Sequence, residues 1–226
     1  MKIFERITKR YALQNYYLRR NFHWPDTLPE ILDYWQQHND LPFLYGGDNW
    51  PYDAMCERQR RKGVYASQYL TPDRTAVHYF TKASRIVDAC CGTGQLTRAL
   101  LLEGVHPSAI LGFDADAELV DLYERLYPET NALRMQFREI DFRCENVIAN
   151  PPFEITECTS FLQWLSRTQC SGDWAVLLLS YGFIDKQRPK AVQETMRHFI
   201  IHYRTPMQEP FARTACRAEI VVVERA

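Results

Sequence analysis

The stretch that decides the fold is Ile86-Val87-Asp88-Ala89-Cys90-Cys91-Gly92-Thr93-Gly94-Gln95-Leu96. It begins as a short apolar strand and ends as a helix, so its two glycines lie in the turn between them. Glycine lets the backbone turn tightly and approach a ligand, and the N-terminus of the following helix offers a positive dipole end. The stretch therefore predicts a nucleotide-like ligand at the end of a buried strand.

Details of this loop narrow the choice of ligand. The third glycine of a dinucleotide fingerprint would fall at Thr97, and no Gly-Lys-Ser/Thr sequence follows that could form a P-loop. Asp88 adds a negative charge, which is unsuited to phosphate and suited to an α-ammonium group. We therefore expect S-adenosylmethionine as cofactor, with Asp88, Cys90, Gly92 and Gly94 among its binding residues.

Acids also follow the second and third predicted strands. Asp114 stands at the end of the second strand, where a carboxylate can bridge two ribose hydroxyls. The third strand, expected over Leu133–Arg138, is followed by Asp141 and Phe142. We expect Asp141 to accept a hydrogen bond from the adenine amino group, with Ile140 or Phe142 against the ring.

A second cluster follows the fourth predicted strand as Asn150-Pro151-Pro152-Phe153. Two prolines make the backbone rigid, so the Asn150 side-chain oxygen and the Pro151 carbonyl can accept hydrogen bonds from one exocyclic amine while Phe153 stacks on its ring. These bonds would direct the amine lone pair at a sulfonium methyl group. In an arbitrary protein such a segment would be an ordinary turn, but in this chain it follows the expected cofactor site. We assign Asn150, Pro151, Pro152 and Phe153 as catalytic.

With Asp88–Gly94 and Asn150–Phe153, the chain resembles the class I S-adenosylmethionine-dependent methyltransferases that methylate amino nitrogens, in particular the N6-adenine-specific DNA methyltransferases. The upstream segment Gln68–Pro72 is similar to the Tyr/Phe-Thr-Pro segment that precedes the glycine loop in that group. This resemblance implies that Thr71 and Pro72 contact the methionine end of the cofactor.

The resemblance covers about residues 65–226 and implies a Rossmann-like α/β fold: a seven-stranded class I methyltransferase sheet with helices on both faces and an antiparallel last strand. We expect a helical N-terminal extension over 1–65 and a methyltransferase domain over 66–226. Expected strands are Arg85–Asp88, Ala109–Phe113, Leu133–Arg138, Asn146–Ala149, Trp174–Leu179, Phe199–Arg204 and Glu219–Glu224; expected helices are Gln95–Glu103, Ala117–Leu126, Glu154–Thr168 and Pro189–His198.

The composition is that of a globular protein of 226 residues, with 27 Lys and Arg against 28 Asp and Glu. A net charge of −1 argues against binding nucleic acid by overall charge, but local basic groups can contact phosphates. Our candidates for such contacts are Arg60, Arg61, Lys186 and Arg188. The basic and aromatic residues 1–25 fit either a nucleic-acid clamp or a solvated face over packed aromatic rings.

Cysteine spacing gives no reason to expect a metal, because the seven cysteines form no CxxC pair. The apolar stretches Trp174–Leu179 and Ile220–Val223 are too short to cross a bilayer. The first residues lack the apolar core of a secretory signal, so we expect a cytoplasmic protein without membrane contact.

We therefore expect methyl transfer to an exocyclic amino nitrogen, with N6 of adenine in DNA or RNA as the leading acceptor. Guanine N2 in ribosomal RNA, a protein glutamine, and a non-catalytic subunit that keeps the fold remain as alternatives. Too few residues follow Phe153 to form a target-recognition domain. A separate partner or the N-terminal extension would then recognise the target.

Overall fold

The computed structural model describes residues 80, 83–185, 190–207 and 217–226, all of which belong to the unit Ala66–Ala226. Some of the sequence predictions lie outside the described residues and stay predictions. They are the extension 1–65 and the candidate residues Arg60, Arg61, Thr71, Pro72, Lys186 and Arg188.

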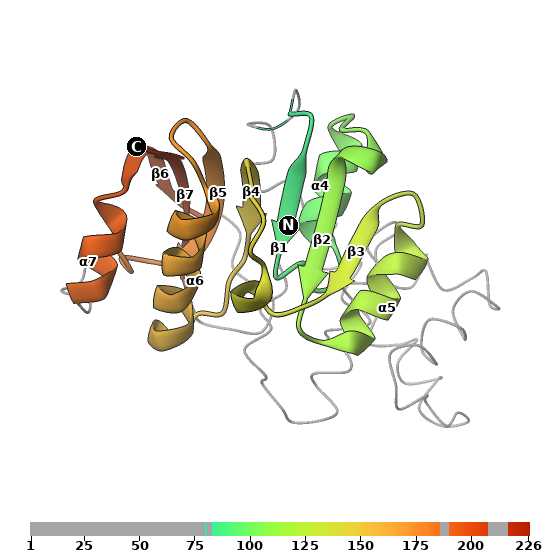
Figure 1. Ribbon diagram of the computed structural model, residues 1–226, viewed down its shortest axis with the longest axis horizontal. Helices are drawn as coiled ribbons and strands as arrows, with labels where there is room; N and C mark the ends of the chain where they lie inside the picture. Colours follow the sequence, from blue (N-terminus) through green and yellow to red (C-terminus); the bar gives the residue numbers. More distant parts are fainter. Residues whose placement is uncertain (1–79, 81–82, 186–189, 208–216) are drawn as a thin grey trace, which may run out of the picture. The chain divides into compact units, whose positions relative to one another are not determined.

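The described residues form a seven-stranded sheet in the order β3-β2-β1-β4-β5-β7-β6 (Figure 1). Strands β1 to β5 are parallel, and β7 runs antiparallel to both β5 and β6. The expected sheet and its antiparallel last strand are thereby confirmed. The strands are β1 Ile86–Ala89, β2 Ile110–Asp114, β3 Asn131–Arg134, β4 Asn146–Ala149, β5 Trp174–Ser180, β6 Phe199–Pro206 and β7 Ala218–Arg225.

Helices cover both faces of this sheet, as expected. Side chains alternate between the faces of a strand, so Val87 packs in one apolar cluster with residues of α6 and α7, and Ile86 packs in another with residues of α4. Helix α5 packs against β2 and β3. The helices are α4 Gln95–Leu102, α5 Ala117–Leu126, α6 Ile155–Thr168 and α7 Lys190–Met196, with 3₁₀ turns η2 Pro107–Ala109 and η3 Phe137–Glu139.

Trp164 of α6 is the largest of the fully buried side chains in the described residues. Its ring lies 5.5 Å from that of Phe113, 6.0 Å from Phe137 and 5.1 Å from Phe161. Its Nε1–H donates to the Ile140 carbonyl at 3.1 Å. Through these contacts the Trp164 ring holds η3 and α6 against the sheet. Its truncation to alanine would therefore cost about 3–5 kcal/mol of stability.

The third strand ends earlier than the sequence indicated. The expected strand was Leu133–Arg138, because Leu133, Met135 and Phe137 alternate as in a strand, but β3 ends at Arg134. Phe137 instead turns into the core within η3, and the backbone N–H of Gln136 donates to Glu139 Oε2 at 2.7 Å. The first residues after β3 are therefore Met135 and Gln136.

The order of the strands reverses between β1 and β4, which are direct neighbours. The chain leaves β1 toward α4 on one face and leaves β4 toward α6 on the other. In sheets of this kind, ligands bind in the crevice between two such connections, at the carboxyl ends of the strands. In Figure 1 this is the lower edge of the sheet.

Candidate functional site

The glycine loop after β1 is held by backbone hydrogen bonds. The N–H of Cys91 donates to the Phe113 carbonyl at 3.0 Å, and the N–H of Gly94 donates to the Cys91 carbonyl at 2.8 Å. Both glycines have positive φ, +56° at Gly92 and +81° at Gly94. A Cβ at Gly94 would overlap the Tyr127 ring, whereas one at Gly92 would meet nothing within 4 Å. Gly94 therefore serves packing, and Gly92 leaves its backbone open to a ligand.

Cys90 precedes these glycines and has φ of 58°, the only positive φ at a non-glycine position among the described residues. This conformation costs an L-residue about 1–2 kcal/mol, and such strain gathers at functional sites. Burial raises the pKa of both the Cys90 and the Cys91 thiols. Neither thiol is thereby suited to act as a nucleophile at neutral pH.

Asp88 connects β1 to the start of α4. Its side chain is fully buried, and its Oδ2 accepts from the backbone N–H of Thr97 at 3.0 Å and from the Thr97 hydroxyl at 2.7 Å. The Tyr123 hydroxyl lies 2.8 Å from Thr97 Oγ1 and donates to it, because the Thr97 proton is already given to Asp88. The sequence analysis missed this network, which stabilises a helix whose N-cap, Gly94, has no side chain.

The other carboxylate oxygen of Asp88 gives a test of whether the residues fit the expected cofactor. Oδ1 is buried and accepts no hydrogen bond in the described part of the chain. Burial raises the pKa of Asp88 to about 7. A nearby ammonium group or a bridging water would satisfy this oxygen and favour its ionised form. The buried oxygen and the open backbone of Gly92 together fit S-adenosylmethionine.

Asp114 ends β2 beside the glycine loop, as expected. Its Oδ2 accepts from the N–H of Gly92 at 3.0 Å, and its Oδ1 accepts from the N–H of Asp116 at 2.9 Å. Each oxygen keeps a second lone pair, so ribose hydroxyls could still donate to this carboxylate. Burial raises the pKa of Asp114, and the two backbone hydrogen bonds partly offset that effect.

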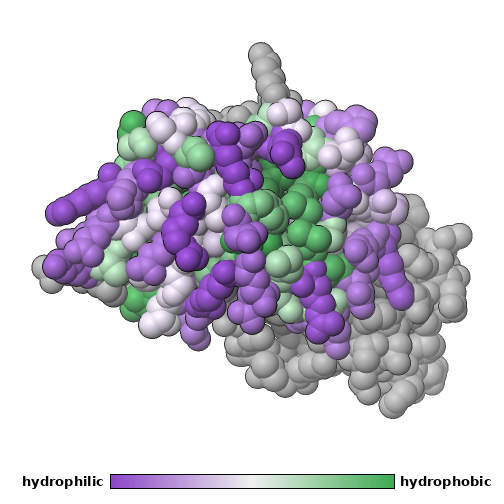
Figure 2. Space-filling model, viewed as in Figure 1, coloured by the Kyte–Doolittle hydropathy of each residue, from purple (hydrophilic) through white to green (hydrophobic). Residues whose placement is uncertain are grey.

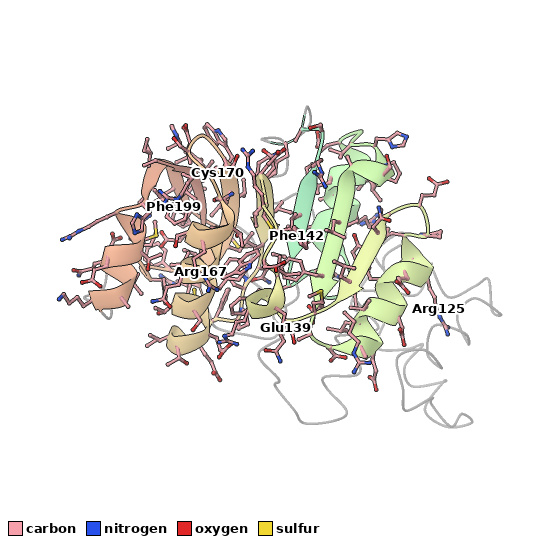
Figure 3. The ribbon with its side chains drawn as sticks, in the orientation of Figure 1. Arg125, Glu139, Phe142, Arg167, Cys170 and Phe199 are labelled. Carbon is pink, nitrogen blue, oxygen red and sulfur yellow. The ribbon has the colours of Figure 1, made fainter. Side chains whose placement is uncertain are left out.

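Phe142 is not brought together with the glycine loop. Phe142 lines a hollow of about 350 Å³ with residues at the starts of β1, β2 and β3, including Arg85, Ile110 and Asn131. Figure 3 shows Phe142 against the face of the sheet, above the η3 turn that carries Glu139. Hydrophobic residues gather over the same part of the sheet in Figure 2. The early end of β3 explains this placement.

Gln136 is a second candidate for the adenine contact that was expected of Asp141. It follows β3 by one residue and its side chain is exposed. The preceding residue, Met135, donates its N–H to the carbonyl of Asp114 at 3.0 Å. This bond fixes the turn beside Asp114, the residue expected to bind the ribose. Correct bounds for the third strand would have identified Gln136 from the sequence, because it is the first polar side chain after β3.

The Asn150–Phe153 segment follows β4 directly. Ala149 pairs with Ala89 of β1, so Asn150 and Cys90 leave neighbouring strands at the same level, about 5 Å apart in the sheet. Pro151 is buried and Phe153 is half-buried, packed against the cluster that contains Ile148. The Oδ1 atom of Asn150 is buried and accepts no hydrogen bond in the described part of the chain.

The connection after β5 contains the candidates Lys186 and Arg188, but its first residue was not among the predicted site residues. It begins with Tyr181, which is 44% exposed although neighbouring Gly182 and Phe183 are buried. β5 lies beside β4 and is parallel to it, so Tyr181 follows a strand that ends at the same edge as Asn150. An aromatic residue directly after a parallel strand is the sequence feature that could have indicated it.

Searches against protein-family models and against curated proteins found no match for this chain. Solved structures resemble it at low identity. A protein from Listeria monocytogenes assigned as a class I S-adenosylmethionine-dependent methyltransferase is 16% identical with a TM-score of 0.59, covering 77% of this chain and 66% of its own. A protein from Pyrococcus horikoshii assigned as an RNA methyltransferase is 18% identical with a TM-score of 0.55, covering 70% and 85%.

A third similar structure is the magnesium protoporphyrin IX methyltransferase of Synechocystis with bound S-adenosylmethionine, 14% identical with a TM-score of 0.54, covering 91% of this chain and 100% of its own. These likenesses show the fold. The described residues have the Rossmann-like fold of the class I S-adenosylmethionine-dependent methyltransferases, as expected from the sequence. None of the helices in the described part is long and apolar enough to span a membrane.

Proposed function

We propose that this protein is an S-adenosylmethionine-dependent methyltransferase that methylates an exocyclic amino nitrogen, with N6 of adenine in DNA or RNA as the leading acceptor. The observation that carries this proposal is the pairing of Ala89 with Ala149. It brings the glycine loop and the Asn150–Phe153 segment to adjacent positions at the edge of the sheet where the strand order reverses.

The cofactor side of the crevice is formed by the loops after β1, β2 and β3. Gly92 would let the ligand approach the backbone, Asp114 would accept from ribose hydroxyls, and Asp88 would face the ammonium group directly or through water. Gln136, which closely follows the end of β3, is our leading candidate for the adenine contact, and Asp141 is the second. When bound, S-adenosylmethionine supplies a methyl group on a positively charged sulfur, which a neutral amine can attack.

The acceptor side is formed by the residues after β4. Asn150 Oδ1 and the Pro151 carbonyl would accept hydrogen bonds from the two amine hydrogens, which localises the lone pair on nitrogen and orients it. The buried position of Pro151 keeps its carbonyl fixed. Part of the Phe153 ring is covered by the core, and the remainder could stack on the acceptor ring. Catalysis would then depend on positioning, without a covalent enzyme intermediate.

Nucleic acid is the acceptor class that this arrangement favours, because a flat base carrying an exocyclic amine matches two acceptors beside an aromatic ring. The name of the similar Pyrococcus horikoshii protein as an RNA methyltransferase agrees with this choice. We also propose that a separate partner recognises the target. The phosphates of the nucleic acid would be bound by the basic side chains of Arg60, Arg61, Lys186 and Arg188.

The test is transfer of labelled methyl from S-adenosylmethionine to unmodified double-stranded DNA, single-stranded DNA, total RNA and protein, followed by digestion and mass identification of the product. We expect N6-methyladenine in one nucleic-acid pool. Detection of N2-methylguanine or methylglutamine would instead identify guanine or a protein glutamine as the acceptor. Absence of both cofactor binding and transfer would favour a non-catalytic subunit instead.

A further inference from the structure

One guanidinium group joins two carboxylates next to the proposed acceptor site. Arg204 of β6 donates from Nη1 and Nη2 to the two carboxylate oxygens of Asp185, at 2.8 and 2.7 Å. The same Nη2 lies 2.9 and 2.8 Å from Oε1 and Oε2 of Glu219 on β7, and Nε lies 3.3 Å from Oε2. The Glu219 side chain is 4% exposed, so Arg204 is the cation that balances its buried charge.

The network fixes the segment Tyr181–Asp185, which follows β5. Glu219 Oε1 also accepts from the N–H of Gly182 at 3.1 Å, near the start of the segment. Asp185, at its end, is bound by Arg204. Between these two points Phe183 is fully buried. The segment is thus held at both ends and packed in the middle, which restricts its backbone.

The segment follows the strand next to β4, on the side of β4 away from the glycine loop. Ala149, the last residue of β4, pairs with Leu177, and β5 continues to Ser180. Three further residues extend β5 about 10 Å past the end of β4. The cofactor loops follow β1, β2 and β3, which lie on the other side of β4. Tyr181 therefore belongs to the acceptor side of the crevice.

We infer that Arg204 and Glu219 are positioning residues that hold the segment Tyr181–Asp185 as a wall of the acceptor site, and that the exposed ring of Tyr181 stacks on the flat heteroaromatic ring of the acceptor. This inference rests on the proposed methyl transfer to a ring amine. A ring that is half exposed beside a fixed backbone loses little conformational freedom on binding, and stacking on an aromatic side chain tolerates any base.

Steady-state kinetics with the acceptor found for the wild-type protein tests the role of the ring. Tyr181→Ala should raise the acceptor KM by roughly tenfold or more, the equivalent of one lost base–aromatic stack, whereas Tyr181→Phe should stay within about threefold of wild type. The dissociation constant of S-adenosylhomocysteine should change in neither variant. An unchanged acceptor KM in an active Tyr181→Ala enzyme overturns the inference and leaves the proposed function intact.

The positioning role has a separate test. Arg204→Lys keeps the charge but cannot bind both carboxylates in the same way, so it should raise the acceptor KM while kcat at saturating acceptor is retained. Amide exchange across the segment Tyr181–Asp185 should accelerate in this variant. The matched control is Arg143→Lys, because Arg143 binds Asp173 through Nε and Nη2 at 3.0 and 2.6 Å, before the start of β5.

The control should leave both the acceptor KM and the exchange of this segment at wild-type values. Unchanged exchange and unchanged KM in Arg204→Lys would overturn the positioning role. If the wild-type protein transfers methyl to no acceptor, the proposed function and this inference are overturned together. If the enzyme is active and its acceptor KM is unchanged in Tyr181→Ala, only this inference is overturned.

Discussion

Thr97 donates two hydrogen bonds to one carboxylate oxygen of Asp88, from its backbone N–H at 3.0 Å and from its hydroxyl at 2.7 Å. Burial opposes ionisation more strongly than these bonds favour it, and the pKa of Asp88 rises from 3.8 to about 7. Between these two pH values the folded protein holds a proton on Asp88 that the unfolded chain has released. Folding and proton binding are therefore linked at this residue.

We expect Asp88 to lower the free energy of unfolding by up to about 4 kcal/mol as pH rises from about 4 to about 7. The sign follows because a raised carboxyl pKa stabilises the fold only while the group stays protonated. Urea unfolding across this pH range measures the slope. Asp88→Asn should lose the Asp88 part of it. A wild-type slope in Asp88→Asn would mean that the pKa of Asp88 is not raised by folding.

Gly92 and Gly94 should respond differently to the same added methyl group. Gly94→Ala places a Cβ within the Tyr127 ring and 2.9 Å from Tyr123 Cδ2, so it should destabilise the fold by about 3 kcal/mol. Gly92→Ala meets no atom within 4 Å and should cost only about 1 kcal/mol, from its positive φ. That methyl group would nevertheless occupy the space of the cofactor.

Thermal unfolding and calorimetric titration with S-adenosylhomocysteine separate the two effects. Gly92→Ala should be a folded protein with weak cofactor binding. If it binds cofactor as the wild type does, the open side of Gly92 is not where the ligand lies.

Asp114→Asn should weaken cofactor binding by roughly tenfold or more, because a hydrogen bond to a charged group contributes about 1.5–3 kcal/mol. The amide oxygen can still accept from the N–H of Gly92, whereas the amide nitrogen cannot accept from the N–H of Asp116, so the turn after β2 loses one hydrogen bond. Asp116→Asn is the matched control, since Asp116 caps α5 through Glu118 N–H and asparagine caps equally well. Wild-type affinity in Asp114→Asn would remove Asp114 from the ribose.

Gln136 and Asp141 offer a direct comparison between the structure and the sequence prediction. Gln136→Ala should weaken binding of S-adenosylhomocysteine by a few fold, as expected for one neutral hydrogen bond. Asp141→Ala should have a smaller effect, because Gln136 closely follows the end of β3 whereas Asp141 lies five residues further along the chain. The reverse pattern would restore the adenine role that the sequence first indicated for Asp141.

The parts of the fold that depend on strong periodicity could be predicted from the sequence. The expected Asn146–Ala149 and Ala117–Leu126 coincide with β4 and α5. The loops after β1 and β4 could also be located, because glycine and proline define them locally. The end of β3 could not, since Phe137 leaves the strand only because α6 offers Phe161 and Trp164 to pack against.

The long-range contacts of the site were also beyond the sequence. Thr97 was noted only as a missing glycine, and its hydrogen bonds to Asp88 and Tyr123 join residues far apart in the chain. Arg204 and Glu219 meet because β6 and β7 form a hairpin, and they reach the segment after β5 because β7 lies between β5 and β6. No local pattern encodes such neighbours.

In the proposed mechanism Asn150 holds the acceptor amine and does not bind the cofactor. Its substitution is therefore the most direct test of that mechanism. Asn150→Ala and the control Asn131→Ala, at the start of β3, would be compared for binding of S-adenosylhomocysteine and for transfer of labelled methyl. We predict that Asn150→Ala binds within about twofold of wild type but transfers at least about 100-fold more slowly, since it lacks an acceptor for the amine. Transfer at the wild-type rate by Asn150→Ala would contradict the proposed mechanism.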